Sequence, residues 1–268
     1  MPLTVATWNI NSVRLRIGLL RQFLARYQPD VVLLQEIKCT NDQFPAKALA
    51  RAGYPHQAVH GQKGYHGVAI ISKLPLADVT RRRFFDVDDS RHVAARLAYC
   101  GQPITVHSFY IPAGGDLPDP EVNPKFRHKL GFLAELRSWF EGPDFRTGHL
   151  IGGDFNIAPH ENDVWSHKQL LNVVSHTPVE TEILNAIQAG GSGWVDLVRK
   201  HIPTEEKLYS WWSYRAIDWQ ASDRGRRLDH IWSTQDIARY SLGAEVVKPA
   251  RGWTRRPSDH VPVIVRLA

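Results

Sequence analysis

Cysteine and long apolar runs are nearly missing from this chain of 268 residues. The two cysteines, Cys39 and Cys100, form no Cys-X-X-Cys pair, so we expect neither a disulfide framework nor a cysteine-based zinc site. No apolar stretch approaches the roughly 18 residues that a membrane-spanning helix needs. The first eleven residues lack a basic segment followed by a long apolar run, so no secretory signal is expected. These absences favour a cytoplasmic protein with reduced thiols and no membrane partner.

Internal repeats, low-complexity tracts and linker-like stretches are also missing. Hydrophobic residues make up 43% and charged residues 22% of the chain, which is enough apolar material to bury a core and excludes a disordered chain. Because no boundary signal interrupts the sequence, we expect residues 1–268 to form one domain and the protein to be a monomer.

Positive charge is distributed unevenly along the chain. The whole sequence carries a net charge of +6, but residues 199–268 alone contain 13 basic and 8 acidic side chains, together with five of the nine tryptophans. Basic charge interleaved with aromatic rings is what a phosphate-rich partner such as a nucleic acid needs. A solvated face with tryptophans in the core would give the same composition, so composition leaves both interpretations open.

Apolar periodicity predicts short strands mixed with a few helices. Strands are expected at Leu3–Trp8, Val31–Leu34, Val68–Ile71, Val93–Leu97, Ile104–Tyr110, a segment ending at Leu150 and Ile151, Leu228–Trp232 and Val261–Leu267. Helices are expected from an N-cap at Ser12 to Tyr27, and at Ala46–Ala52, Lys125–Phe140 and Pro178–Gln188. This pattern indicates an α/β protein with a two-layer sheet core and helices outside.

Polar side chains stand at the ends of four predicted strands, after three of them and before the last, where a rigid sheet would present them. They are Asn9 and Asn11, Glu36, Asp154 and Asn156, and the pair Asp259 and His260 before the last strand. Carboxylate and amide oxygens suit Mg²⁺ or Mn²⁺ better than zinc. Each residue alone is explained by a turn or an exposed charge. Together they predict a metal-dependent site.

Five ordered motifs resemble those of the endonuclease/exonuclease/phosphatase superfamily. They span almost the whole chain, at Thr7–Asn11 (TWNIN), Gln35–Glu36, Gly152–Asn156 (GGDFN), Arg227–Asp229 and Ser258–Pro262 (SDHVP). The resemblance implies a DNase I-like, four-layer α/β sandwich, in which two packed mixed β-sheets are flanked by helices. It also implies hydrolysis of a phosphoester.

Tyr110 is similar to the residue that distinguishes one branch of this superfamily. The DNase I, sphingomyelinase and inositol-phosphatase branches typically have a histidine at the end of this strand, whereas the exonuclease III branch of abasic-site endonucleases has a tyrosine. His107 lies three residues earlier, so strand alternation places it on the opposite face, and we interpret it as structural. The strand therefore resembles the exonuclease III branch.

Two later segments, residues 209–215 and 224–229, are similar to the part of exonuclease III that forms a pocket for a sugar without its base. The resemblance places Trp211 in this pocket, its neighbour Trp212 in the core, and Leu228 in an apolar wall. Asn11 and Arg226 complete the expected substrate-binding set, although Arg226 stands where relatives often have an aromatic or aliphatic residue. Ala113 stands where the family commonly has Asn or Gln.

The resemblance implies a role for each strand-end residue. Tyr110, Asp154, Asn156, Asp229 and His260 would be catalytic, with Asp229 orienting His260, and either Asp154 or His260 would be the general base. One or two metal ions would be held by Asn9, Glu36, Asp154, Asn156 and Asp259. Phosphate contacts are expected from the basic residues Arg81, Arg82, Arg83, Lys125, Arg127, Lys129, Arg226, Arg251, Arg255 and Arg256.

The predicted function is that of a Mg²⁺-dependent DNA-repair nuclease (Mn²⁺ being possible). It would cut double-stranded DNA 5′ to abasic sites in base-excision repair and act on damaged 3′ ends as a 3′–5′ exonuclease or 3′-phosphatase. Two alternatives stay open. One is a non-specific DNase or a lipid or inositol-phosphate phosphodiesterase of the same superfamily, and the other is a catalytically inactive DNA-binding member.

Overall fold

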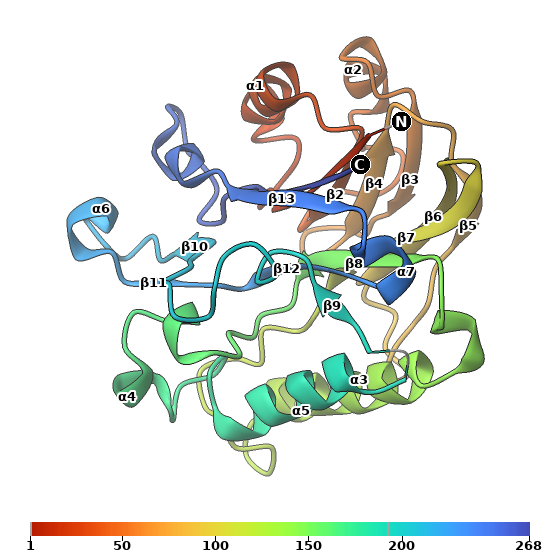
Figure 1. The fold of residues 1–268 in the computed structure, drawn as a ribbon. Helices are drawn as coiled ribbons and strands as arrows, with labels where there is room; N and C mark the ends of the chain where they lie inside the picture. Colours follow the sequence, from red (N-terminus) through yellow and green to blue (C-terminus); the bar gives the residue numbers. More distant parts are fainter. Residues whose placement is uncertain (1, 192) are drawn as a thin grey trace.

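Two β-sheets packed face to face form the centre of the protein, and helices cover both outer faces (Figure 1). The computed structural model describes residues 2–191 and 193–268, and Met1 and Ser192 lie outside the described residues. The four layers confirm the predicted α/β sandwich with two mixed sheets. Among the residues described, no helix is both long enough and apolar enough to cross a lipid bilayer.

The first sheet has β1 and β2 at its centre, and these two strands run parallel. Within the described residues it contains six strands, in the spatial order β13 (Ser241–Val246), β14 (Val263–Leu267), β1 (Leu3–Asn9), β2 (Val31–Gln35), β4 (Val68–Ser72) and β3 (His56–His60).

The second sheet has β7 and β8 at its centre, again parallel, with β12 antiparallel to β8. Its six strands in the described part of the chain are β5 (Ala77–Thr80), β6 (His92–Tyr99), β7 (Gln102–Tyr110), β8 (His149–Asp154), β12 (Asp229–Ser233) and β9 (Val195–Asp196). A separate short ribbon pairs β10 (Trp211–Trp212) with β11 (Gly225–Arg226).

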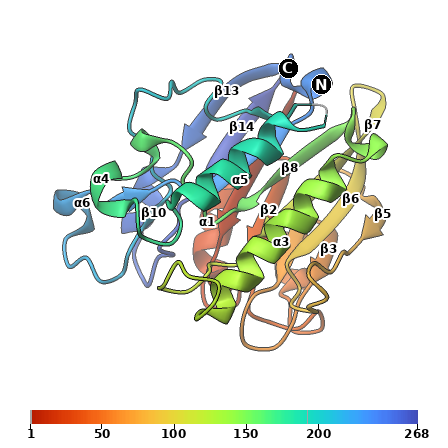
Figure 2. The ribbon, with the colours of Figure 1, turned by 90° about the horizontal axis from the view of Figure 1, so that it is seen from below.

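In the part of the chain that the structure describes, two longer helices cover each sheet. Helices α1 (Ile17–Tyr27) and α2 (Ala46–Arg51) lie over the first sheet, and α3 (Pro124–Phe140) and α5 (Pro178–Ala189) lie side by side under the second (Figure 2). The connections contain short helices at α4 (His167–Leu170), α6 (Trp219–Ser222), α7 (Gln235–Ala238), η1 (Pro143–Phe145), η2 (Glu161–Asp163) and η3 (Lys248–Gly252).

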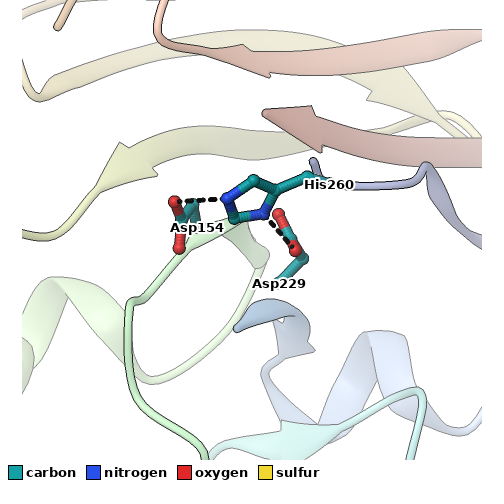
Figure 3. A group of neighbouring side chains, drawn as sticks. All are labelled: Asp154, Asp229 and His260. Atoms are coloured by element: carbon teal, nitrogen blue, oxygen red, sulfur yellow. Dashed lines mark hydrogen bonds and ion pairs between the residues drawn. The ribbon is translucent and has the colours of Figure 1, made fainter. Parts of the chain in front are cut away.

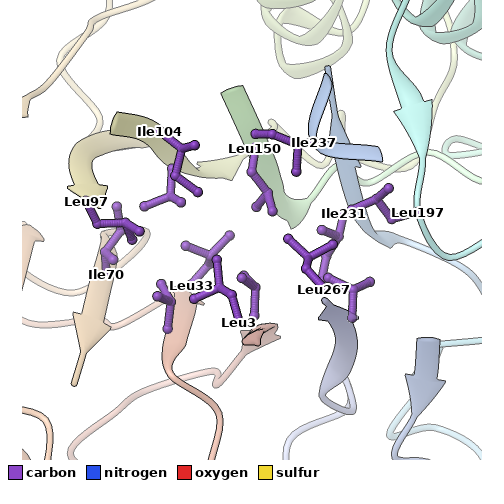
Figure 4. Close-up of a cluster of buried hydrophobic side chains, with 14 of the residues drawn as sticks. Leu3, Leu33, Ile70, Leu97, Ile104, Leu150, Leu197, Ile231, Ile237 and Leu267 are labelled. Carbon is purple, nitrogen blue, oxygen red and sulfur yellow. The ribbon is translucent and has the colours of Figure 1, made fainter. Parts of the chain in front are cut away.

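Strand alternation explains how both faces of each sheet are buried. In β2, Val31 and Leu33 point between the sheets, where they pack with residues such as Ile104, Leu150 and Ile231 (Figure 4). Val32 and Leu34 of the same strand pack on the helix side, with Leu20 and Phe23 of α1. On the other outer face, Phe132 and Leu136 of α3 pack against Phe109 of β7. The core thus fixes both sheets rigidly beneath the strand ends.

Strand register carries the polar strand ends to one edge of the sandwich. Asn9 is paired with Gln35, the residue before Glu36, and Asp154 is paired with both Tyr110 and Asp229. Gly153 makes this pairing possible, because a Cβ atom there would lie 1.9 Å from the carbonyl oxygen of Phe109. A side chain at this position would push Asp154 out of register.

Most of the predicted elements are confirmed to within two residues at their ends, but the first helix is not. It begins at Ile17, and Ser12 has a left-handed backbone with φ of 83°. The amides of Ser12 and Val13 donate to the carbonyls of Glu36 and Ile37, which holds this segment in turns. Strands β3, β5 and β13 were not predicted, because they are edge or near-edge strands whose residues are mostly half-buried or exposed.

His107 is buried on the face of β7 opposite Tyr110, as the structural interpretation requires. It belongs to a row of three histidines on β6, β7 and β8. Its Nδ1 lies 3.1 Å from Nε2 of His92, and its Nε2 lies 3.0 Å from Nδ1 of His149. Burial lowers the pKa of all three imidazoles, and that of His92 falls to about 3.

This histidine row predicts acid-sensitive stability. A histidine whose pKa is lowered by folding binds fewer protons in the fold than in the unfolded chain, so stability falls as the pH drops below about 6.5. For His92 the loss between pH 7 and pH 5 is about 2 kcal/mol. Guanidinium unfolding at the two pH values should show a smaller difference for His107→Gln than for the wild type. The control His56→Gln, on β3, should keep the wild-type difference. An equal pH dependence in His107→Gln would contradict the assignment.

Candidate active site

The strand ends bring Asn9, Glu36, Tyr110, Asp154 and Asp229 together at one edge of the two sheets. His260 joins them from the loop before β14. Its carbonyl oxygen accepts a hydrogen bond from Nε1 of Trp8 at 3.0 Å, which fixes this loop against β1. The sequence-predicted residues therefore form one continuous cluster across both sheets.

His260 lies between two buried carboxylates (Figure 3). Its Nδ1 is 2.8 Å from Oδ2 of Asp229, and its Nε2 is 3.5 Å from Oδ2 of Asp154. Burial alone would lower the pKa of His260, but the charges of Asp229 and Asp154 outweigh burial and raise the pKa. The ring is thus held as a cation, with Nε2 directed to Asp154.

Ser210 holds the other side of Asp229. Its hydroxyl donates to Oδ2 of Asp229 at 2.6 Å and accepts from the backbone amides of Leu228 and Asp229. Ser210 is fully buried, and the sequence reasoning did not assign it a role. The sequence gives one indication of this role, since Ser210 directly precedes Trp211 in the segment 209–215 that resembles the sugar pocket.

Asn9 connects the carboxylates to one another. Its Nδ2 lies 2.9 Å from both Oε1 of Glu36 and Oδ2 of Asp154, and 3.4 Å from Nε2 of His260. The hydroxyl of Tyr110 donates to the same Oε1 of Glu36 at 2.9 Å. Burial, followed by the charges of Glu36 and Asp154, raises the pKa of Tyr110 well above its usual value. Tyr110 is therefore a neutral donor.

Lys38 is a second residue that the sequence reasoning missed. Its Nζ lies 2.8 Å from Oε2 of Glu36 and donates to Oδ1 of Asn11 at 2.7 Å. Burial raises the pKa of Glu36, but Lys38 and Asn9 outweigh it, so the pKa is lowered overall. Glu36 also has a left-handed backbone, with φ of 49°, which is costly for a residue with a side chain and concentrates at functional sites.

Asp259 contacts Asn11 and Trp211 from the loop before β14. Its Oδ1 accepts from Nδ2 of Asn11, and its Oδ2 accepts from Nε1 of Trp211, both at 3.0 Å. Burial would raise the pKa of Asp259, but His260 and these two donors lower it. Asp259 is thus an ionised carboxylate that joins the metal-ligand candidates to the aromatic pocket.

Asp154 is fixed at both oxygens. Oδ1 accepts from the backbone amide of Asn156 at 2.9 Å, while Oδ2 accepts from Asn9. Burial, with contributions from Asp229 and Glu36, raises the pKa of Asp154 despite the nearby His260. The side-chain amide of Asn156 donates to the carbonyl of Ile111 at 2.9 Å, and its backbone is left-handed, with φ of 54°.

The cluster suits a divalent cation. The cluster contains four carboxylates, of which Asp154 and Asp229 are buried and Glu36 and Asp259 are half-buried. Among the residues the structure describes, their ion pairs within 4.0 Å involve two cations, His260 and Lys38. Buried negative charge in excess favours a bound metal ion. Oδ1 of Asp229 also has no hydrogen-bond partner within the described part of the chain.

One group of possible metal ligands combines Asp154, Asp229 and His260, whose ligand atoms lie within 4.8 Å of one another. It shares only Asp154 with the set predicted from sequence. Both ring nitrogens of His260 already face carboxylates, which makes the ring a poor ligand compared with the oxygen donors around it.

A pocket of about 560 Å³ lies beside this cluster, with Trp165, Trp211, Arg215, Arg224 and Arg226 in its lining. The guanidinium of Arg226 lies over the ring of Trp211, 5.4 Å from its centre, and that of Arg224 lies over Trp165 at 4.7 Å. Pairs of this kind bind stacked or phosphate-bearing groups. The lining of the pocket thus combines aromatic rings with positive charge.

Of the residues predicted to form the pocket, Trp211 and Arg226 line it, whereas Leu228 is buried. Trp211 is partly exposed in the pocket, and Trp212 is buried, as expected. Leu228 is buried behind Trp211, in a small cluster with Ala158 and Val164, and does not line the pocket. The Nη1 of Arg226 donates to the carbonyl of Val174 and the hydroxyl of Ser175, so this side chain is held across the pocket edge.

Two of the basic residues proposed for phosphate contacts are buried and cannot reach a DNA backbone. Lys129 is completely buried, and Arg251 is buried with its Nε donating to the carbonyl of Trp212. A sequence shows charge but not burial, and both side chains are paired inside the protein.

Comparisons with known proteins identify relatives that match almost the whole chain. Residues 6–260 match the model of the endonuclease/exonuclease/phosphatase family. The chain is 33% identical over 266 residues to exodeoxyribonuclease III of Haemophilus influenzae, which covers 96% of this chain and 97% of that protein. It superposes on a Neisseria 3′ phosphatase, NExo, solved with a product DNA hairpin, with a TM-score of 0.89, 30% identity and 99% of each chain covered. An AP endonuclease from Archaeoglobus fulgidus gives a TM-score of 0.88, with 30% identity and 98% of each chain covered.

The fold and the carboxylate cluster are those expected of a phosphoester hydrolase, and the chain belongs to the endonuclease/exonuclease/phosphatase family. Within that family its relatives place it in the exonuclease III and AP endonuclease group. The protein is therefore a nuclease with a candidate acidic metal site.

Proposed function

We propose that this nuclease uses Mg²⁺ to hydrolyse the phosphodiester 5′ to abasic sites in double-stranded DNA, as a monomeric cytoplasmic enzyme of base-excision repair. It would also act on damaged 3′ ends as an exonuclease or phosphatase. The observation that carries the proposal is the position of the Trp211 pocket. Nε1 of Trp211 binds Asp259, so a sugar in the pocket would place its phosphate beside the carboxylates. The similarity to a 3′ phosphatase and to an AP endonuclease supports both activities.

Oxygen donors fit Mg²⁺ or Mn²⁺ at this site. We assign Glu36, Asp259 and Asn9 to hold the ion, with Asp154 and Asn156 as further candidates. When bound, the ion would polarise the scissile phosphate and neutralise charge on its oxygens. The sequence-derived ligand set is preferred over the group containing His260, because both nitrogens of that ring face carboxylates.

Hydrolysis adds water to phosphorus and breaks the bond to the 3′ oxygen, leaving a 3′-hydroxyl and a 5′-phosphate. Asp154, with its raised pKa, is suited to orient the attacking water and accept its proton. His260, held by Asp229, carries a proton at Nε2 and stabilises negative charge on the phosphate. Tyr110 and Asn156 each supply a neutral donor for the phosphate or the leaving oxygen.

A panel of substrates tests the proposal. The protein is incubated with a duplex carrying one abasic site, an undamaged duplex and an inositol phosphate, each with Mg²⁺ or with a chelator. We expect chelator-sensitive cleavage immediately 5′ to the abasic site and little cutting within the undamaged duplex. Turnover of only the inositol phosphate would contradict the proposal, and binding without any cleavage would indicate an inactive member.

Arg226 should tune the choice of substrate. Its guanidinium lies over the ring of Trp211 in the lining of the pocket, so its positive charge lies beside any phosphate that enters there. We expect Arg226→Leu to lower kcat/KM about tenfold for a 3′-phosphate end, the scale of one charged hydrogen bond, while abasic-site cleavage changes less. Arg226→Lys, which keeps the charge but loses the planar pair of donors, should be intermediate. Equal losses on both substrates would show that Arg226 is only structural.

A further inference from the structure

A completely buried ion pair lies directly behind the proposed phosphate site. Lys129 of α3 and Glu180 of α5 are both fully inaccessible, and Nζ of Lys129 is 2.5 Å from Oε1 of Glu180. Removing two charges from water costs several kcal/mol for each ion, and an apolar pair of similar volume is often as stable. Stability alone therefore does not explain a buried ion pair at this position, and its other contacts suggest a further role.

Lys129 uses its remaining hydrogens on two active-site loops. Its Nζ donates to the carbonyl of Asn156 at 2.8 Å and lies 3.4 Å from the carbonyl of Ala113. An ammonium has three hydrogens, so these two carbonyls and Glu180 satisfy it completely. Both loops follow central strands of the second sheet, β8 and β7 respectively, and each continues from a strand-end residue of the candidate site. One ammonium thus ties together the two loops beneath the phosphate.

The contact at Asn156 has a specific consequence for geometry. Asn156 has a left-handed backbone, which is unfavourable for residues with side chains unless surrounding contacts hold it. In this conformation its amide reaches Oδ1 of Asp154, and its side chain reaches the carbonyl of Ile111. The hydrogen bond from Lys129 to the Asn156 carbonyl is the contact from α3 that stabilises this conformation.

Glu180 extends the connection towards the pocket. Its carboxylate accepts from the backbone amides of Ser175 and Thr177 and from the hydroxyl of Thr177, at 2.7–3.2 Å. The hydroxyl of Ser175 in turn accepts from Nη1 of Arg226 at 2.7 Å. A continuous chain of contacts therefore runs from Asn156 through Lys129 and Glu180 to Ser175 and Arg226.

We propose that Lys129 and Glu180 are positioning residues that hold Asn156 in its reactive geometry and fix the edge of the Trp211 pocket relative to it. Neither side chain reaches solvent, so neither touches substrate. This inference rests on the proposed function, because it assigns a purpose to geometry at Asn156. It predicts that loss of the pair slows the chemical step more than it weakens binding of DNA.

The test compares Lys129→Met with the double variant Lys129→Met/Glu180→Gln. The double variant leaves no unpaired charge, and the glutamine keeps an acceptor for the Ser175 and Thr177 amides. Thermal unfolding establishes that the variant is folded at the assay temperature. On an abasic duplex with saturating Mg²⁺, we expect kcat to fall at least about tenfold and KM to change less than about threefold. A folded double variant with wild-type kcat would overturn the positioning role.

Two further variants separate positioning from general stability. Arg199→Met removes another buried cation, which binds Asp163 and the carbonyls of Ile202, Pro203 and Glu206, and should reduce stability while leaving kcat unchanged. Combined with Asn156→Ala, Lys129→Met should add little to the loss in kcat, because both changes disable the same group. Fully additive losses would overturn the inference. If wild-type protein itself leaves the abasic duplex intact, the proposed function fails, a result distinct from unchanged kcat in the double variant.

Discussion

Asp154→Asn should lower kcat on an abasic duplex by at least about two orders of magnitude, the usual loss when a general base or an electrostatic group is removed. The asparagine keeps the shape of the side chain, and its oxygen can still accept from Asn9 or from the amide of Asn156. What it loses is the negative charge and the capacity to accept a proton. Because Asp154 is buried with a raised pKa, this neutral replacement should not reduce stability.

Single-turnover cleavage with saturating Mg²⁺ measures this prediction, and thermal unfolding verifies that the variant is folded. Asp144→Asn, an exposed change in η1 away from the site, should retain wild-type kcat. A folded Asp154→Asn variant that keeps more than about a tenth of wild-type kcat would remove Asp154 from the proposed chemistry.

Glu36→Ala should cause the second large loss, through the metal ion. Glu36 is the carboxylate shared by Asn9, Tyr110 and Lys38, so its removal deletes an anionic oxygen donor and leaves Lys38 without its partner. We expect kcat at saturating Mg²⁺ to fall at least about a hundredfold, and half-maximal activity to need at least about tenfold more Mg²⁺.

A titration of activity against Mg²⁺ concentration separates the two possible ligand sets. Lys38→Met serves as a comparison, because it removes the cation that competes for Glu36 and should lower the Mg²⁺ requirement. If Glu36→Ala leaves the Mg²⁺ dependence unchanged, the ion is held elsewhere. The group of Asp154, Asp229 and His260 would then be the alternative.

Sequence patterns located the polar residues at the strand ends for a physical reason, and the structure shows that these ends converge. Short apolar strands buried on both faces are visible as continuous runs, and a polar residue directly after such a run must lie at the edge of the sheet. Asn9, Glu36 and Asp154 were found in this way, whereas Asp229 was assigned through the Arg227–Asp229 motif. The ordered motifs then indicated the sandwich, in which the two sheets present these ends to one another.

Residues whose roles depend on tertiary packing could not be predicted from the sequence. Lys129 was expected at the surface, because a lysine in an amphipathic helix is usually solvated, yet here it is fully buried on Glu180. Ser210 and Lys38 contact Asp229 and Glu36 through side-chain rotamers that depend on the tertiary packing. Tertiary contacts also explain why the segment after Ser12 is not helical. Its amides donate to carbonyls of the Glu36 loop, and these hydrogen bonds outweigh its helical periodicity.

The basic and tryptophan-rich last quarter of the chain, residues 199–268, contributes to both the carboxylate cluster and the pocket. It supplies Asp229, Asp259 and His260 to the cluster, and Trp211, Arg224 and Arg226 to the adjacent pocket. Its positive charge is therefore part of the site and not a separate binding segment. Such charge would help to bring a DNA backbone to carboxylates that otherwise repel it.

The most direct test of the account follows the oxygen atom of the attacking water. A duplex with one internal tetrahydrofuran abasic analogue, which has no aldehyde and cannot be cleaved by elimination, is incubated with the protein and Mg²⁺ in ¹⁸O-labelled water. Mass spectrometry of the two product ends should show one ¹⁸O in the 5′-phosphate of the abasic fragment and an unlabelled 3′-hydroxyl on the other. An intact duplex, or ¹⁸O in the 3′-hydroxyl, would contradict attack of water on phosphorus at the 5′ side of the abasic site.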